Sequence, residues 1–494
     1  MAEQSKSLDK ALSQSSVAEP QPISQTEGHE RQMRVTFNLW STLGLVYSIT
    51  ATPFGVGSYL TFSLILGGSP FYIYGYIFAI FFNITLCVAL AEISALYPHP
   101  SGHIYWVGKM APKGWENSLS FWTGALTSAA WFFWNAGTYL LTAQILLAAV
   151  EHLYPEYTAQ PWHQVLIAWA QALASAMIVI TNAGIIFIAV SLLVQAHPKQ
   201  SARSVFVDVV NESGWPSKGV VFFLGLLPGS TAINGFDSAA HMVEEMPDPA
   251  RQVPQVMVGN AFLSGLSGIP MVIIFCFCIT NVDNLLAPVG GVTIIQIFKD
   301  SLHNDALFVV SSVIYILVTI VAATACTTTC SRVWWSFSEH NGLPLHSWFA
   351  VIHRTKLWAV PVNAIGVIAV LSCLVLLINL GPSFVLAALF SAANICFYVS
   401  YIITICCFLY TKWTKGLPAH YLNLGRLFGN AIDITSIIWS VFVSVWLMFP
   451  YYLPVNSKNM NYTIAIVAVV VVVFGLDWFI RARRSYFIPS QLLI

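Results

Sequence analysis

Long apolar runs recur along almost the whole chain, and they constrain its fold more than any other feature. Most are about 20 to 30 residues long, enough for a helix rising 1.5 Å per residue to cross about 30 Å of hydrocarbon. Because lipid offers no partner to a free backbone N–H or C=O group, such segments must be helical. The chain is therefore predicted to be an all-α polytopic membrane protein. The runs lie at residues 40–66, 71–96, 121–150, 162–181, 182–196, 217–242, 256–281, 305–330, 360–380, 383–410, 432–453 and 461–480.

Composition agrees with this class and excludes several others. Of 494 residues, 57% are hydrophobic and 9% are charged, whereas a soluble protein carries about 25% charged residues. The 21 basic and 21 acidic residues balance, so no positive field attracts nucleic acid. All nine cysteines lie within apolar runs or at their ends, where neither a disulfide nor a metal site is expected. We expect the lipid bilayer as the surroundings, no nucleic-acid partner, and neither cofactor nor metal.

The stretch from residue 162 to 196 decides the number of crossings. As one helix it would be about 52 Å long, too long for a single span. As two spans it needs a turn around residues 181–184 and leaves an unusually short fifth helix. Two spans place 16 of the 21 basic residues on the side of the N-terminus, and one span places 11 there. Since cytoplasmic loops carry the excess of Lys and Arg, we predict about twelve helices with both termini cytoplasmic.

Two of the runs are interrupted by glycine, proline and small polar residues, and the interruptions lie five helices apart. They occupy residues 50–58 in the first helix and 228–238 in the sixth. Matched breaks are typical of transporters with a five-plus-five inverted repeat, whose substrate site lies where the broken helices meet. Two further helices would follow the repeat. The alternative is a pair of proline kinks satisfied by neighbouring helices.

An unwound helix frees backbone groups, and the N-terminus of the resumed half-helix suits a carboxylate. Phe236, beside the second break, is a candidate lid over bound substrate. Asn135 in the third helix could face the cavity or join helices by a hydrogen bond. The hydroxyl groups predicted to assist substrate binding at the first break are those of Ser48, Thr50 and Thr52.

Ionisable residues within apolar helices are costly and usually functional. Asp237 lies near the middle of the sixth helix, where it could couple proton movement, pair with a substrate ammonium, or fix helix packing. His241 follows four residues later and is its expected partner. Glu92 closes the second helix, where a structural hydrogen bond to a neighbouring helix end is expected. The aromatic residues Trp131, Phe132, Phe133, Trp134, Trp334 and Trp335 are expected in belts at the membrane surfaces.

A series of short motifs, in register along the chain, carries a family resemblance. They are Gly67–Pro70, Ala91–Pro98, Ser101–Trp106, Gly235–Met242 with Glu244-Glu245, Ser331-Arg332, Asn341–Pro344, Leu422–Arg426 and Asn459–Tyr462. Together they resemble the fungal amino acid, choline and GABA permeases of the amino acid–polyamine–organocation superfamily. The resemblance implies a permease domain over residues 37–488, between a disordered tail at 1–36 and a short tail at 489–494.

The family implies a small-molecule substrate, namely an amino acid, GABA, choline or a related amine, commonly driven by protons. It implies the plasma membrane, with the vacuolar membrane as the alternative. By position, the first break from Thr50 to Gly55, with Ala51 and Thr52 between them, would hold the substrate carboxylate or an equivalent polar end. Gly235 and Phe236 would form the other half of the pocket, and Asp237 occupies the acidic position of that motif.

Two alternatives remain open. About twenty residues expected between the fourth and fifth helices are missing, which would suit a nutrient sensor that does not transport, or a defective paralogue. A membrane enzyme would need a catalytic cluster at one membrane face, and His340, His346 and His353 are the candidates. Their spacing fits no catalytic or metal-binding pattern, so a transporter is the favoured interpretation.

Overall fold

The computed structural model describes residues 37–174, 182–286, 288–354, 359–380, 385–457 and 459–489. The tail expected at 1–36 and nearly all of the tail at 489–494 lie outside these ranges. The described chain is mostly helical, as predicted. The two short strand pairs join β1 (Leu66–Gly67) to β2 (Val210–Asn211) and β3 (His353–Arg354) to β4 (Ala359–Val360), both antiparallel.

Among the described residues, nine helical segments are long and apolar enough to cross a membrane. Six of them are single α-helices, and the other three are made of consecutive shorter helices. The single helices are α5 (Gly68–Leu96), α7 (Glu116–Leu153), α13 (Pro249–Phe277), α16 (Asp305–Glu339), α19 (Val385–Thr414) and α20 (Arg426–Trp446). The composite segments are α11 (Lys218–Leu224), α12 (Leu227–Thr231) and η1 (Phe236–Glu245); α18 (Val362–Leu376) and η3 (Leu377–Leu380); and α21 (Thr463–Asp477), η4 (Trp478–Ala482) and α22 (Arg483–Ser485).

The three remaining predicted crossings consist of shorter helices. The first contains α2 (Leu39–Thr50), α3 (Thr52–Ser58) and α4 (Leu60–Ile65), and the fourth and fifth contain α8 (Pro161–Ala174) and α9 (Asn182–Gln195). The other helices lie in the connections between the crossings. These are α6 (His103–Met110), α10 (Ala202–Phe206), α14 (Val282–Leu286), η2 (Val289–Gly291), α15 (Thr293–Ser301) and α17 (His346–Phe349).

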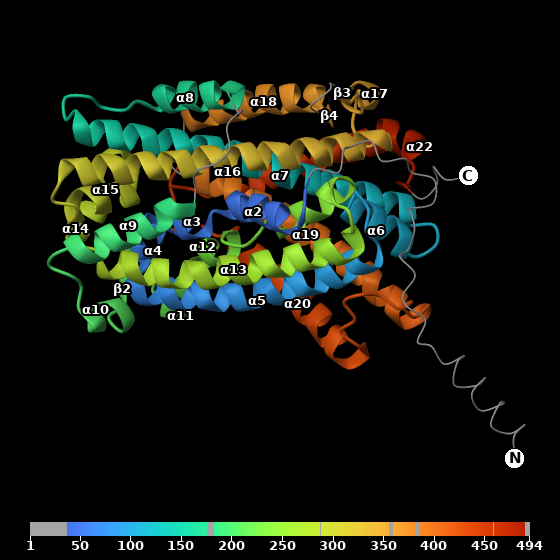
Figure 1. Cartoon of the computed structure of the whole chain (residues 1–494), viewed down its shortest axis with the longest axis horizontal. Coiled ribbons are helices and arrows are strands. Elements are labelled where there is room, and N and C mark those ends of the chain that lie inside the picture. The colour runs from blue at the N-terminus through green and yellow to red at the C-terminus, as the bar shows by residue number, and fades with distance from the viewer. Residues whose placement is uncertain are drawn as a thin grey trace, which may run out of the picture.

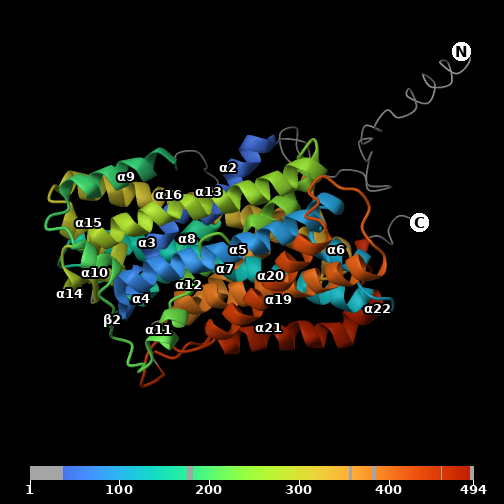
Figure 2. The same ribbon diagram turned by 90° about the horizontal axis from the view of Figure 1, so that it is seen from below.

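The helices run side by side along the long axis of the molecule (Figure 1). The short helices α6, α17 and α22 gather at one end, and α10, α14 and α15 gather at the other. Helices α7 and α19 pack against each other, and most of each apolar stretch is buried. Helix α21 lies along the outer edge (Figure 2), and only 11% of its apolar stretch is buried. A helix that exposes valine and isoleucine in this way is placed to contact lipid.

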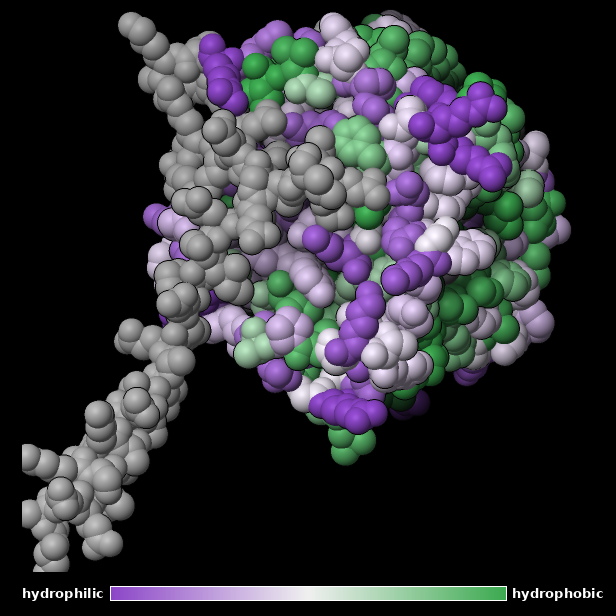
Figure 3. All heavy atoms as spheres, turned by 90° about the vertical axis from the view of Figure 1, so that its right-hand side faces the viewer, coloured by the Kyte–Doolittle hydropathy of each residue, from purple (hydrophilic) through white to green (hydrophobic). Residues whose placement is uncertain are grey.

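The end that carries α6, α17 and α22 is polar. Figure 3 looks onto this end, where hydrophilic side chains lie across the face and hydrophobic ones continue at its rim. This pattern is that of a bundle end which meets water, with apolar flanks that meet lipid.

The fourth and fifth crossings are described only in part, because residues 175–181 between α8 and α9 lie outside the described residues. The described α9 has 14 residues, about 21 Å of helix against about 30 Å of hydrocarbon. Helix α8 packs on α7 and α18, while α9 packs on α16 and α13. The prediction of a turn at residues 181–184 is wrong for residues 182–184, because α9 already begins at Asn182. Residue 181 lies outside the described residues.

The expected aromatic belts are also wrong for the six residues named above. All of them are at most 9% exposed, and Trp131 is fully buried. They lie on the faces where α7 and α16 pack inside the bundle, and Trp334 donates a hydrogen bond to the Ser128 carbonyl at 3.2 Å. Their composition suited a membrane surface, but their position along α7 and α16 places them in the core.

Candidate functional site

The first crossing breaks where the sequence predicted. Helix α2 ends at Thr50, Ala51 takes a left-handed conformation with φ of 40°, and α3 begins at Thr52. Pro53 in the first turn of α3 has no N–H group, so the ladder of helical hydrogen bonds cannot continue through it. The break therefore follows directly from local sequence.

The sixth crossing breaks in the same layer, and the two breaks touch. Helix α12 ends at Thr231, and Gly235 has φ of +93° before η1 begins at Phe236. The Thr52 hydroxyl donates a hydrogen bond to the Ala232 carbonyl, which joins one break to the other. A Cβ atom on Gly235 would lie 3.3 Å from both Ile49 and Trp131. The second break thus needs glycine for its backbone and also for its close packing.

The other predicted substrate-binding residues differ in what they contact. The Thr50 hydroxyl is 3.1 Å from that of Ser264 on α13, and the Ser48 hydroxyl bonds back to its own helix at Gly44. Gly55 is half-buried in α3. The Ser48 hydroxyl is thus used within its own helix. Thr50, Ala51, Thr52 and Gly55 lie at the break.

Asn135 joins helices in this conformation. Its Oδ1 accepts from Thr327 of α16 at 2.9 Å, which matches the packing alternative. Its buried Nδ2 has no hydrogen-bond partner among the described residues. Phe236 is fully buried and stacks on Tyr401, with ring centroids 5.8 Å apart, so it covers the break from the side of α19.

Asp237 lies immediately after the second break and is fully buried. Its Oδ2 accepts a hydrogen bond from Trp131 at 3.2 Å and lies 3.7 Å from His241 Nε2. The contact with His241 is the one predicted from the sequence. His103 of α6 approaches the same oxygen, at 4.0 Å.

Three buried residues at this site were given no functional role from the sequence. His103 belongs to a motif of the resemblance, and Trp131 was expected in a belt. Asn234 follows α12, and its side-chain amide donates to the Asn394 side chain on α19. His103 and Trp131 become part of the site only through packing between distant segments, so no local pattern could have identified them, whereas Asn234 lies within the predicted break at residues 228–238.

Beyond Asp237, the far end of η1 is tied to two other crossings. Arg332 of α16 and Glu245 form an ion pair at 2.6 Å, with both side chains at most 10% exposed. The backbone N–H of Phe37 donates to the Glu245 carbonyl at 3.1 Å. The pair therefore holds η1, α16 and the start of α2 together.

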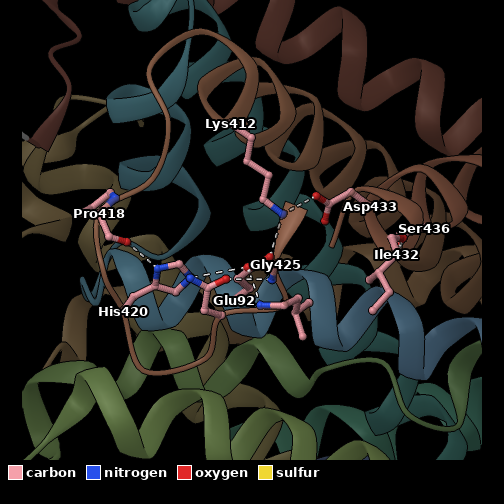
Figure 4. Close-up of polar contacts among 10 residues, drawn as sticks. Glu92, Lys412, Pro418, His420, Gly425, Ile432, Asp433 and Ser436 are labelled. Carbon is pink, nitrogen blue, oxygen red and sulfur yellow. Dashed lines mark hydrogen bonds and ion pairs between the residues drawn. The ribbon is translucent and has the colours of Figure 1, made fainter. Parts of the chain in front are cut away.

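A second cluster of buried charge lies around Glu92 at the end of α5 (Figure 4). Lys412 of α19 bridges Glu92 and Asp433 of α20, with both distances 2.8 Å. Glu92 also accepts from the backbone N–H of Leu424 at 3.0 Å. The predicted structural role of Glu92 is confirmed: it fixes the loop before α20 to the end of α5.

His420, in that loop, completes the cluster. Its Nδ1 faces the Pro418 carbonyl at 2.8 Å, and its Nε2 faces Glu92 at 3.5 Å. Both neighbours are acceptors, so the imidazolium form, with hydrogen on both ring nitrogens, fits this position. The contact with Glu92 raises the pKa of His420 above its ordinary value. With His420 charged, two carboxylates face two cations.

This arrangement predicts a pH-dependent stability. Since the folded-state pKa of His420 is raised, its contribution is complete below about pH 6.5, the ordinary histidine value, and is lost as pH rises through the folded pKa. The wild-type protein should therefore lose thermal stability over this range, whereas His420→Gln should show a smaller slope. Thermal unfolding in detergent at pH 5.5 to 8.5 measures it; identical slopes would disprove the assignment. His197→Gln, in another loop, is the control.

The three histidines of the enzyme alternative do not share an environment. His340 is buried, His346 is half-buried and His353 is exposed. His340 Nε2 lies 3.4 Å from the Ser101 hydroxyl. Their positions give no support to a catalytic cluster at the surface.

Comparisons with known proteins agree on one class. A family model described as amino acid permease matches residues 37–473. The choline transporter of Saccharomyces cerevisiae is 27% identical over 474 residues, which cover 92% of this chain and 83% of that protein. Transmembrane transporter swnT of Metarhizium robertsii is 25% identical, covering 92% and 93%. Amino-acid permease BAT1 of Arabidopsis thaliana is 23% identical, covering 94% and 95%.

A solved structure supports the fold. MhsT, crystallised in complex with L-phenylalanine, superposes with a TM-score of 0.53 over 84% of this chain and 99% of its own, at 14% identity. The family and its relatives are permeases, not enzymes, and they are integral membrane proteins. With a family model spanning most of its length, this chain belongs to the amino acid permease family.

Proposed function

We propose that the protein is a secondary active transporter that moves an amino acid or a related amine, such as GABA or choline, by alternating access. The substrate binds between the two breaks, contacted by Thr50, Ala51, Thr52 and Gly55 on one side and by Gly235 and Phe236 on the other. Asn135 contributes its unpaired amide from α7. The observation that carries the proposal is the direct bond between the breaks, Thr52 to Ala232, beside the buried carboxylate of Asp237.

The transport cycle we propose uses two five-helix repeats in inverted orientation, and protons drive it. Asp237, with His241, is the coupling and gating group, because a buried ionisable residue beside a substrate site is where protonation can alter helix packing. The end that carries α6 faces the cytoplasm, as do both termini. The membrane is the plasma membrane, with the vacuolar membrane as the alternative.

The test is a competition uptake panel with Gly235→Val as the diagnostic variant. Cells expressing the protein take up labelled amino acids, GABA, choline and polyamines at several pH values. A valine at Gly235 must adopt φ of +93° and places its Cβ atom 3.3 Å from Ile49 and Trp131, which separates the breaks. We expect uptake to fall at least tenfold, corresponding to about 1.4 kcal/mol of lost interaction.

Gly114→Val is the matched control, because Gly114 has φ of +86° but no atom within 4 Å of its added Cβ. It shares the backbone strain without the close packing, and its uptake should stay near wild type. Saturable uptake that Gly235→Val leaves intact would place the substrate elsewhere.

A sensor that binds substrate without transporting it is the second candidate. The compressed stretch from residue 162 to 196 favours it, since its 35 residues leave little chain for two crossings of a bilayer of about 30 Å. Purified protein that binds a labelled compound of the panel, but carries none of it into proteoliposomes, would establish the sensor and refute the transporter.

A further inference from the structure

His103, Asp237 and His241 form a buried triad built from two distant segments. His103 opens α6, and the other two lie on η1. One ligand-type atom from each residue lies within 4.8 Å of the other two, and all three side chains are at most 1% exposed. Gly102 has φ of +50°, and a Cβ atom there would be 3.0 Å from His241 Cε1. Glycine thus lets the start of α6 approach His241 closely.

The geometry of the triad offers a position for one added proton. His241 Nδ1 faces the Pro100 carbonyl at 3.3 Å, so this nitrogen must carry hydrogen and donate. In the neutral ring Nε2 is then bare, yet it faces the Asp237 carboxylate at 3.7 Å. Among the described residues, His241 Nε2, Asp237 Oδ1 and both ring nitrogens of His103 have no hydrogen-bond partner. A neutral His103 can turn its one N–H group toward Asp237, but the bare His241 Nε2 faces the carboxylate with a lone pair unless a proton is added.

Charge leads to the same conclusion. Tyr401 of α19 and Cys87 of α5 also act on Asp237, and neither supplies positive charge. On α16, Arg332 is paired with Glu245; on α13, Arg251 lies over Tyr421; and α2 carries no charged side chain. A buried carboxylate without a counter-charge is costly, and one added proton makes the triad neutral.

We propose that this triad holds the coupling proton of the transport cycle, and that His103 is a coupling residue together with Asp237 and His241. The proposal rests on the proposed function and adds to it a proton-binding residue from α6. The added proton lies between an imidazole and the carboxylate, and it joins α6 to η1. When it leaves, the remaining negative charge favours a conformation in which water reaches Asp237, so proton release is linked to separation of α6 from η1.

The experiment compares two activities of the full chain in proteoliposomes. One is accumulation of the labelled compound that the uptake panel selects, driven by a pH gradient, with trapped pyranine reporting proton entry. The other is exchange of labelled for unlabelled compound without a gradient. His103→Gln should lose accumulation and substrate-dependent proton entry at least tenfold more than it loses exchange. His340→Gln, a buried histidine that contacts Ser101 in the neighbouring segment, should resemble wild type in both.

The outcomes distinguish failure of the proposed proton-coupled transport from failure of the role inferred for His103. If wild type exchanges but moves no protons, proton coupling itself is wrong. If wild type couples and His103→Gln couples equally, or loses both activities in equal measure, His103 is structural and the inference is overturned. A chelator arm covers the remaining chemistry: accumulation that EDTA abolishes and Zn²⁺ restores would make the triad a metal site instead, since two imidazoles and a carboxylate also suit zinc.

Discussion

Replacing Asp237 by asparagine is expected to abolish accumulation of substrate against its gradient while reducing exchange far less. The amide keeps the size of the side chain but cannot hold or release a proton at that oxygen. With one proton per substrate, a difference of two pH units supports about 100-fold accumulation, because each tenfold ratio corresponds to about 1.4 kcal/mol. The variant should equilibrate substrate at a ratio near one. Uptake into proteoliposomes with an alkaline interior measures it.

Asp283→Asn is the control for this prediction, because Asp283 is exposed on α14 and far along the chain from both breaks. It should accumulate substrate as wild type does. Undiminished accumulation by Asp237→Asn would remove this carboxylate from the coupling mechanism, and loss of protein from the membrane would show that its role is packing.

Replacing Lys412 by methionine is expected to cause the largest loss of stability. The ammonium group bridges Glu92 and Asp433 and is 7% exposed, while the two carboxylates are at most 1% exposed. Removing it leaves both carboxylates buried without their shared cation, a change that costs about 3–5 kcal/mol in comparable buried pairs. The unfolding temperature in detergent should fall sharply. Size-exclusion chromatography of heated samples measures it.

Two further variants test the cause. Lys415→Met removes an exposed lysine three residues away and should leave the unfolding temperature near wild type. Combining Lys412→Met with Glu92→Gln and Asp433→Asn removes the uncompensated charge, and it should recover much of the loss. A triple variant no more stable than Lys412→Met alone would contradict the electrostatic explanation.

The helical class and both breaks could be predicted because they depend on local chemistry. Long apolar runs must be helical in lipid whatever their neighbours, and Pro53 and Gly235 act on the backbone within a few residues. Glu92 was correctly assigned a structural role because its place at a helix end was visible in the sequence. In each case the physical cause lies within one segment.

What could not be predicted depends on which segments meet. Tryptophan is a residue type expected at membrane surfaces. Trp131 instead donates a hydrogen bond to Asp237 in the core, because α7 passes beside the second break. His103 and Asp237 are separated by 134 positions along the chain, and only the docking of α6 against η1 brings them together. Lys412, given no role from the sequence beyond the charge count, joins three crossings for the same reason.

The winding of η1 has a mechanical consequence. Its ten residues form 3-10 turns on either side of a kink at Met242, where φ is −110° and ψ is 16°. Such turns rise about 2.0 Å per residue against about 1.5 Å in an α-helix. The same ten residues rewound as an α-helix would be about 5 Å shorter, and their side chains would turn about the axis by about 20° per residue. Such a change of pitch would move Asp237 along the axis while Glu245 stays anchored to Arg332, and the kink at Met242 between them is where the winding can change.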